Sequence, residues 1–543
     1  MKPNELKSVA DVVAATLRNY GARFAFGIPG NDVLETVRAC EEAGIEFVLA
    51  KSEPAAAFMA DAVWQLTGKP SILIPALGPG ISNAVSGIAG AMMERSAVIV
   101  LSGEMTTKNM GIYNHQVFDH VALCRPVTKY AEQLNPQRAG QQVAKALDIA
   151  MTWPAGPVML NVAADANKSA AADHACSPGL RLTQTLSDDS RDALIALLAG
   201  ASKPLALIGR GALMSSAPAS VEKFIRDWQI PFVATYKAKG VIDERDPLCV
   251  GSVGLSPVVD AITMRAVKES DLLVMIGFDP IELRDAWVDG WPADKPVITL
   301  DWAPTNDRIF PRGQEGYGTL PAMLHQLSRP GSPRPSGWSL SSTLSEVRTE
   351  AGAVVKPRTP AHGISPAALF DAIDRRNRPD WIMTVDVGAH RILANHVLHC
   401  RTPGQLLQSN GLGCMGYAIP AAIGAQFVHR EKTVVAMLGD GCMLMTLGEV
   451  ALAAEENLPI VIVVLNDHKL SLIALKQDKM KMESRGVDFR SPNFATIAQG
   501  FGAEGVRVTT LAEFETAFEK AVASRKLTVI DAVVDPSEYW EQM

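Results

Sequence analysis

Short apolar runs alternate with stretches of helical spacing along most of this chain. An unbroken apolar run of about four to eight residues is typical of a strand buried on both faces, whereas apolar side chains at every third or fourth position indicate a helix packed on a sheet. The repeated alternation predicts an α/β fold of doubly wound parallel-sheet domains. The predicted strands are residues 71–75, 97–101, 158–162, 205–208, 272–276, 297–300, 382–385, 433–438 and 460–465.

Two segments interrupt this alternation. Residues 166–188 and 328–362 are rich in alanine, serine, proline and charged side chains, a composition that is typical of linkers. A chain of 543 residues is also too long for one hydrophobic core. The two linkers therefore divide the chain into three predicted α/β domains, at residues 1–167, 189–327 and 363–543.

Composition and charge exclude several classes of protein. A net charge of −7 disfavours binding to nucleic acid, whose backbone is itself negative. The sequence has no apolar run of the roughly 18 residues that a membrane helix needs, and its polar start does not resemble a signal peptide. The seven cysteines include no CxxC pair, so we expect reduced thiols in a cytoplasmic protein.

Candidate chemistry is concentrated between residues 433 and 466. The strand predicted over 433–438 ends in a tight turn, Gly439–Asp440–Gly441, and residues 443–455 have helical spacing. The next predicted strand ends at Asn466, so we expect Asp440 and Asn466 at the same edge of a parallel sheet. A carboxylate and an amide oxygen suit Mg²⁺, which leaves coordination positions for phosphate oxygens. The alternative is an ordinary strand-to-helix turn.

A second group of interest lies near the N-terminus. Residues 24–37 are predicted to form a strand, a Gly-Pro-Gly turn and a helix that Asn31 or Asp32 caps. After another short strand at 47–50, Glu53 stands at the start of a helix, directly before Pro54. Glu53 is thus either a carboxylate that interacts with the helix dipole or a functional acid at the mouth of a sheet.

These motifs together resemble those of the thiamine diphosphate enzymes, in the group similar to pyruvate oxidase and acetolactate synthase. The resemblance extends over nearly the whole chain and is greatest to the catabolic, flavin-independent acetolactate synthases. The turn at Asp440 followed by Asn466 matches the cofactor signature, except that Asp467 replaces the usual second asparagine. Further matching segments are residues 67–70, 77–83, 114–119, 277–282, 386–390 and 409–416.

The resemblance implies the following roles. Glu53 would hydrogen-bond N1′ of the cofactor's aminopyrimidine, and Met415 would be the wedge that bends the cofactor. Gln116 would reach the reacting carbon, and His115 either faces the site or has an ordinary structural place. Gly388 and His390 would lie near the diphosphate, and Mg²⁺ would be held by Asp440, Asn466 and the backbone carbonyl of His468. The other predicted cofactor-binding residues are Gly413, Gly439, Gly441 and Cys442.

The implied reaction is the thiamine diphosphate- and Mg²⁺-dependent decarboxylation of a 2-oxo acid such as pyruvate, followed by carboligation to a second carbonyl compound. Three alternatives remain: a decarboxylase that releases an aldehyde, a flavin-dependent oxidase, and a non-catalytic module that binds the cofactor. The resemblance also implies a homodimer or homotetramer, in which Glu53 of one chain meets the diphosphate site of another. No nucleic-acid or membrane partner is expected.

Several positions depart from the family pattern and leave the substrate open. Ser52 and Pro54 replace a usual histidine and glutamine around Glu53. In the middle domain, the Gly209–Arg210–Gly211 turn is a dinucleotide fingerprint that lacks its third glycine. Because residues 278–281 resemble those of flavin-free relatives, we expect no FAD there. The basic side chains near residue 480 either hold an anionic acceptor or form a solvated helix face; they are Lys476, Lys479, Lys481 and Arg485.

Overall fold

The computed structural model describes residues 7–180, 182–284, 287, 291, 294–304, 309–310, 313–328 and 337–543. Residues 329–336 of the second predicted linker, and residue 181 of the first, lie outside the described residues. The contacts of the chain divide it into two compact units. The first takes in the N-terminal residues to 181 with 409–431 and 445–460, and the second takes in 182–408, 432–444 and 461–543.

The prediction of an α/β fold with parallel sheets is confirmed. The described residues form three six-stranded sheets, and the strands pair in parallel wherever their register is defined. The first and third sheets share one strand order, β2-β1-β3-β4-β6-β5 and β14-β13-β15-β16-β18-β17. The central sheet has the order β12-β11-β10-β7-β8-β9, which is that of dinucleotide-binding domains.

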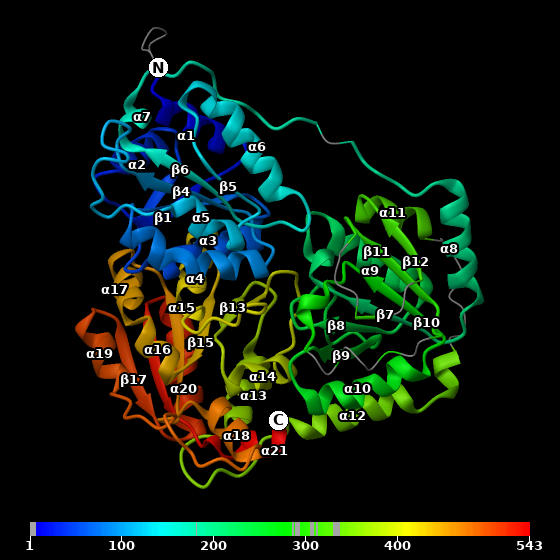
Figure 1. The fold of residues 1–543 in the computed structure, drawn as a ribbon. Helices are drawn as coiled ribbons and strands as arrows, with labels where there is room; N and C mark the ends of the chain where they lie inside the picture. Colours follow the sequence, from blue (N-terminus) through cyan, green and yellow to red (C-terminus); the bar gives the residue numbers. More distant parts are fainter. Residues whose placement is uncertain are drawn as a thin grey trace. The chain divides into compact units, whose positions relative to one another are not determined.

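The first sheet lies between two layers of helices (Figure 1). Helices α1 (Val9–Asn19), α2 (Leu34–Glu42) and α6 (Ala139–Met151) form one layer, and α3 (Glu53–Thr67), α4 (Pro79–Met93) and α5 (His120–Cys124) form the other. Its strands are β1 (Phe24–Ile28), β2 (Glu46–Leu49), β3 (Ser71–Pro75), β4 (Val98–Glu104), β5 (Tyr130–Gln133) and β6 (Val158–Ala163).

Helix α3 is buried on nearly every side, as its run of alanine and other apolar residues predicts. It packs against α4 and, within the same compact unit, against α15 (Ala418–Val428). The helices approach closely because glycine faces the contact: a Cβ on Gly87 of α4 would lie 2.5 Å from the Cβ of Ala57, and one on Gly424 would lie 2.6 Å from the carbonyl oxygen of Met59.

The central sheet is also covered on both faces (Figure 1). Helices α8 (Asp188–Gly200), α9 (Ala217–Trp228) and α11 (Leu320–Leu327) pack on one face, and α10 (Pro257–Glu269) and α12 (Thr343–Val354) on the other. Its strands are β7 (Pro204–Ile208), β8 (Phe232–Thr235), β9 (Cys249–Val253), β10 (Leu272–Ile276), β11 (Val297–Asp301) and β12 (Gln314–Tyr317).

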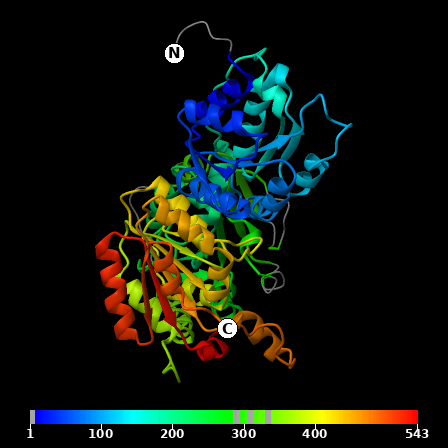
Figure 2. The same ribbon diagram turned by 90° about the vertical axis from the view of Figure 1, so that its left-hand side faces the viewer.

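The third sheet packs one face against α13 (Pro366–Arg376), α14 (Ala389–Val397) and α20 (Leu511–Ser524). Figure 2 shows α20, in red, beside the last two strands. The strands are β13 (Ile382–Val385), β14 (Leu406–Gln408), β15 (Val434–Gly439), β16 (Ile460–Asn466), β17 (Glu504–Val508) and β18 (Thr528–Val533). No helix in the described part of the chain is both long enough and apolar enough to span a bilayer.

Three local predictions were wrong. Helix α2 begins at Leu34 without a side-chain cap, because Asp32 instead accepts a hydrogen bond from the backbone N–H of Leu77 (2.8 Å). The helix expected over 443–455 is two helices, α16 (Asp440–Met445) and α17 (Leu447–Glu455), which meet at Thr446. The predicted linker 328–362 contains α12, whose Val347 is buried in the central core.

Candidate functional site

The third sheet places the Gly439–Asp440–Gly441 turn where such sheets bind ligands. Strands β13 and β15 are neighbours although β14 separates them in sequence, so the chain leaves their carboxyl ends in opposite directions. Ligands of open α/β sheets bind in the crevice at this switch point. Strand β13 leads to Gly388 at the start of α14, and β15 leads directly to Asp440.

Asp440 is the centre of a buried polar group. Its Oδ2 accepts hydrogen bonds from the backbone N–H of His468 (2.8 Å) and from the Ser491 hydroxyl, and its Oδ1 accepts from the N–H of Gly441 (2.8 Å). Burial raises the pKa of Asp440 above its ordinary value. Burial, followed by the nearby Asp440 carboxylate, raises the pKa of Asp467 to about 7. Two acidic groups thus lie close together in a site that a cation would stabilise electrostatically.

Asn466 supplies an unused oxygen beside this group. It is fully buried at the end of β16, and its Nδ2 donates to Asp531 (2.9 Å), but its Oδ1 has no hydrogen-bond partner. An orphaned buried acceptor is unusual and is explained if a ligand completes it. The described residues contain no group of three or more His, Cys, Asp or Glu side chains suited to a metal. A set with one carboxylate, one amide oxygen and one backbone carbonyl instead fits Mg²⁺.

His390 lies against the glycines of the same strand ends. A Cβ on Gly388 would lie 2.5 Å from the His390 ring, and one on Gly439 would lie 3.4 Å from it, so only glycine at 388 leaves room for the ring. Burial, and second the Arg391 charge, lower the pKa of His390 to about 3, so the imidazole is neutral. Its Nε2 is buried without a partner. The Cys442 thiol lies 3.4 Å from the Val387 carbonyl oxygen.

Glu53 is the first residue of α3, as the sequence predicts, and its side chain is 9% exposed. Its Oε2 accepts a hydrogen bond from Nδ2 of Asn83 in α4 (2.5 Å). A Cβ on Gly80, in the first turn of α4, would lie 3.6 Å from its other oxygen. The carboxylate is therefore held between the starts of two helices in the first compact unit.

The loop that follows β3 brings Gln116 close to Gly78. Gly78 has a φ of +69°, and a Cβ there would lie 2.6 Å from the carbonyl oxygen of Gln116, so this position requires glycine. The N–H of Gly78 lies 3.3 Å from Nε2 of the buried His120. Gln116 and His115 are both exposed, and the His115 ring lies 6.0 Å from that of Tyr113.

The 409–416 segment belongs to the same compact unit as Glu53. The Cys414 sulfur lies 3.7 Å from the Ser86 hydroxyl of α4, one turn beyond Asn83. Gly413 has a φ of +69°, a conformation that favours glycine, and Met415 is half-buried. Met415, the predicted wedge residue, thus lies on a tight turn beside α4, the helix whose Asn83 bonds Glu53.

Glu449 is a polar residue of this unit that no sequence pattern singled out. It lies in α17, is 2% exposed, and accepts hydrogen bonds from the backbone N–H of Lys51 (3.2 Å) and from the Ser52 hydroxyl (3.4 Å). Burial raises its pKa to about 7. Glu449 therefore fixes the two residues before Glu53. The available signal was a carboxylate among the apolar residues of α17, and it did not identify the distant partner.

The basic side chains near residue 480 are partly occupied by the protein itself. Lys479 donates to the terminal carbonyl oxygen of Met543, and Arg485 pairs with Glu483 (2.6 Å). Lys476 and Lys481 are exposed. Binding of an anionic acceptor here stays a prediction.

In the central domain, the glycine turn that follows β7 lies close to the backbone that follows β10. A Cβ on Gly209 would lie 2.5 Å from the Cα of Phe278, and one on Gly211 would lie 2.8 Å from the Cα of Gly277. Glu282 lies beside them, 1% exposed, and accepts hydrogen bonds from the N–H of Arg210 (2.8 Å) and from the Thr235 hydroxyl. The Gly209–Gly211 turn is therefore packed against the chain's own backbone at Gly277 and Phe278.

We expect Glu282→Gln to stabilise the protein at high pH only. Burial, and second the Asp279 charge, raise the pKa of Glu282 from 4.5 to about 7. Because the unfolded chain loses this proton near its ordinary pKa, the carboxylate costs stability increasingly as the pH rises from 4.5 to 7. The shift corresponds to at most about 3 kcal/mol. Glutamine, which never ionises, removes that cost and can still accept from the Arg210 N–H.

Melting temperatures of the parent and Glu282→Gln, followed from about pH 5 to about pH 8, test this. The gap in favour of the variant should open as the pH rises. Glu269→Gln is the matched control, because hydrogen bonding to Lys203 lowers the pKa of Glu269 to about 2. The carboxylate is then ionised in both the folded and the unfolded chain over this range, so this variant should be less stable than the parent by an amount that does not change with pH. A gap for Glu282→Gln that does not change with pH would contradict the assignment.

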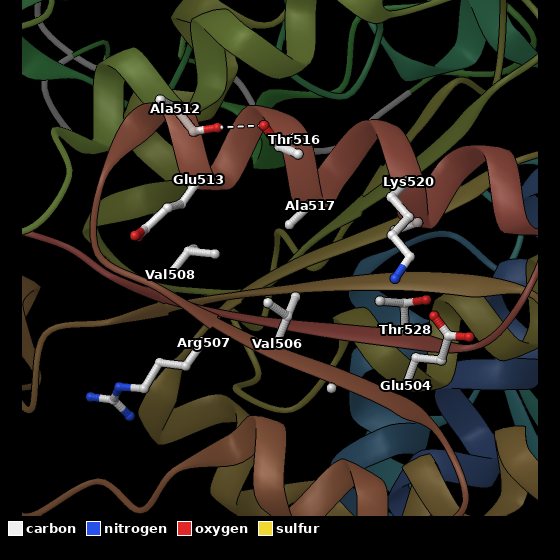
Figure 3. Close-up of a pocket in the computed structure, with 12 residues that line it drawn as sticks. Glu504, Val506, Arg507, Val508, Ala512, Glu513, Thr516, Ala517, Lys520 and Thr528 are labelled. Carbon is white, nitrogen blue, oxygen red and sulfur yellow. Dashed lines mark hydrogen bonds between the residues drawn. The ribbon is translucent and has the colours of Figure 1, made fainter.

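A separate cavity of about 640 Å³ lies between β17, β18 and α20. Figure 3 shows Val506, Val508 and Ala517 pointing into it, with Lys520, Thr528 and Glu504 at one end. It contains none of the predicted site residues. The predicted site residues form two separate groups, one at the strand ends of the first sheet and one at those of the third.

Comparison with known proteins identifies the three domains. Residues 7–123, 191–309 and 386–532 match the N-terminal TPP binding domain, the central domain and the C-terminal TPP binding domain of thiamine pyrophosphate enzymes. The chain is 28% identical to an acetolactate synthase of Bacillus subtilis, over 97% of this chain and 93% of that protein.

Similar values are found for subunits of other bacteria. The acetolactate synthase large subunit of Haemophilus influenzae is 28% identical, over 98% of this chain and 95% of that protein. The acetolactate synthase isozyme 3 large subunit of Escherichia coli is 27% identical, over 98% of this chain and 96% of that protein. These proteins are distant relatives along their full length. With its three matched domains, the chain belongs to the family of thiamine pyrophosphate enzymes.

Proposed function

We propose that this protein decarboxylates a 2-oxo acid such as pyruvate, with thiamine diphosphate and Mg²⁺, and joins the remaining fragment to a second carbonyl compound. The full-length similarity to acetolactate synthases supports this reaction class. The observation that carries the proposal is the buried, unpartnered Oδ1 of Asn466 beside the Asp440 and His468 group. That set of oxygens is suited to a magnesium-bound diphosphate.

The residues at the end of the third sheet fit the cofactor. Asp440, the Oδ1 of Asn466 and the backbone carbonyl of His468 would hold Mg²⁺, and His390 would lie beside the diphosphate. When bound, thiamine diphosphate supplies the electron sink that lets carbon dioxide leave a 2-oxo acid. Cys442 and Gly441 would border the diphosphate from the turn after β15.

Glu53 would hold and exchange a proton at N1′ of the pyrimidine ring. Its fixed place at the start of α3, with one oxygen bonded to Asn83, leaves the other oxygen to face the ring. Gln116 and His115 would contact the substrate near the reacting carbon. Met415 would press the two rings of the cofactor into their reactive arrangement.

We propose a homodimer or homotetramer, in which Glu53 of one copy acts on the cofactor held by Asp440 of another. The loop that carries Gln116 exposes apolar side chains: Ile112 is 84% exposed, with Tyr113 and Phe118 also open to solvent. Exposed apolar side chains grouped on one loop are typical of a protein contact and support this proposal. A second copy of the chain would cover them and bring Gln116 to the site.

We also propose that the central domain binds no flavin. In dinucleotide sites, the glycine turn lets the backbone approach a pyrophosphate. Here the turn at Gly209 and Gly211 approaches the backbone around Gly277, and the buried carboxyl of Glu282 lies beside it. A pyrophosphate would have to displace this backbone and would be repelled by the Glu282 carboxylate.

Mass spectrometry of the products formed from pyruvate, with and without an added aldehyde, tests the proposed reaction. Carboligation predicts a 2-hydroxy-2-alkyl acid with one carbon dioxide released per coupling. An aldehyde alone would indicate simple decarboxylation. Peroxide together with the visible absorption of a bound flavin would indicate an oxidase. Equal turnover after removal of thiamine diphosphate and Mg²⁺ would overturn the proposal.

A further inference from the structure

Polar side chains from three neighbouring strands meet on one face of the third sheet. Asp531 of β18 is paired in register with Arg507 of β17 and with Val464 of β16. Asn466 is two residues beyond Val464, and alternate residues of a strand share a face, so Asn466, Asp531 and Arg507 lie on the same side. Asp531 is fully buried in an otherwise apolar strand. Burying a carboxylate in such a strand costs free energy unless hydrogen bonds and an opposite charge offset it.

Both oxygens of Asp531 are fully used. Its Oδ1 accepts from Nδ2 of Asn466 (2.9 Å), and its Oδ2 accepts from the Arg507 guanidinium (2.8 Å) and from the N–H of Phe494 (3.1 Å). The Arg507 side chain is 30% exposed and offsets the buried charge. Figure 3 shows Arg507 pointing away from the cavity that Val506 and Val508 line, toward the other face of the strand.

The carboxylate determines which way the Asn466 amide faces. A carboxylate only accepts hydrogen bonds, so Asn466 must turn its NH₂ toward Asp531. Its oxygen then faces the opposite side, where it is buried without a partner. Rotation of the amide by half a turn would exchange the two atoms and present N–H groups instead, which cannot bind a cation.

We propose that Asp531 is a positioning residue of the metal site, which holds the Asn466 amide so that Oδ1 faces the cation. This inference rests on the proposed function, since it takes Asn466 as a metal ligand. Arg507 and the N–H of Phe494 both donate to Oδ2 of Asp531, which leaves Oδ1 to accept from Asn466. Asp531 touches neither substrate nor cation, and it acts only through Asn466.

The experiment measures Mn²⁺ affinity, by electron paramagnetic resonance of the free ion, in protein saturated with thiamine diphosphate. Asp531→Leu should weaken Mn²⁺ binding by about 10- to 100-fold, as loss of an outer partner of a ligand does. In an Asn466→Ala background the same change should have less than about a twofold effect, because the two residues act as one unit. Asp531→Asn, which conserves volume, should give an intermediate loss.

Asp374→Leu is the matched control. Asp374 is a partly buried carboxylate on α13 that holds the backbone N–H (2.7 Å) and ring of His399, away from the candidate ligands. It should lower the melting temperature without changing Mn²⁺ affinity. If Asn466→Ala leaves the affinity unchanged, the proposed metal site itself is wrong. Suppose instead that Asn466→Ala weakens Mn²⁺ binding. The positioning role is then wrong if Asp531→Leu or Asp531→Asn alone has no effect, or if its effect is undiminished in the Asn466→Ala background.

Discussion

Glu53→Gln should reduce single-turnover decarboxylation of pyruvate by about 10²- to 10⁴-fold, the range attributed to general acid–base catalysis. Glutamine can still accept the hydrogen bond from Asn83, so α3 and α4 should remain in place. It cannot exchange a proton at N1′ of the pyrimidine. Binding of thiamine diphosphate should change little, because the Asp440 group that would hold its diphosphate is intact.

A second readout separates this chemistry from general damage. Deuterium exchange at C2 of the bound thiazolium, followed by proton NMR after acid quench, should slow in parallel with turnover. Asp61→Asn is the matched control: Asp61 is a buried carboxylate of the same helix, with hydrogen bonds to Ser96 and Tyr417. It should lower stability while exchange stays near the parent rate. Parent-like exchange in Glu53→Gln would remove Glu53 from the mechanism.

Asp440→Asn should weaken Mg²⁺-dependent binding of thiamine diphosphate by about 100-fold, which corresponds to nearly 3 kcal/mol. The substitution conserves volume but removes the only charge among the proposed ligands. Because Asp440 is buried, a cation bound there without its negative charge would be costly. Isothermal titration with the cofactor, with and without Mg²⁺, measures the change. The difference between the two conditions should nearly vanish in the variant.

Asp488→Asn is the control for this second prediction. Asp488 is an exposed carboxylate near the same loop that pairs with Lys469, so its loss removes a charge without touching the proposed ligands. Affinity should stay close to that of the parent. An Asp440→Asn protein that binds the cofactor and Mg²⁺ normally would show that the cation lies elsewhere.

The strands were the most predictable part of the fold. Strands buried on both faces are continuous apolar runs, so β3, β10 and β13 begin and end where the pattern predicts. Boundaries set by tertiary contacts were not predictable. Asp32 is a good helix cap by composition, but it bonds the Leu77 loop instead. Helix α12 was not recognised because Val347 is its one buried residue, and the surrounding proline, serine and charged residues resemble a linker.

The candidate site divides in the same way. Asp440, Asn466 and Glu53 follow from motifs that combine a turn with the end of a strand or the start of a helix, so local sequence was enough to propose them. Glu449 and Asp531 could not be found in that manner. Each is a single acid in an apolar stretch, and its meaning depends on partners far away in the sequence, Lys51 for one and Asn466 for the other.

The packing of α3 against α15 has a consequence for synthesis of the chain. Domains generally fold as they emerge from the ribosome, N-terminal first. Here the apolar surface of α3 is covered by α15, which is translated only after the whole central domain. During synthesis, the apolar surface of α3 therefore stays exposed until α15 has been translated. Exposed apolar surface of this kind is what chaperones bind. For the same reason, a fragment that stops near residue 180 should be recovered mainly as aggregate.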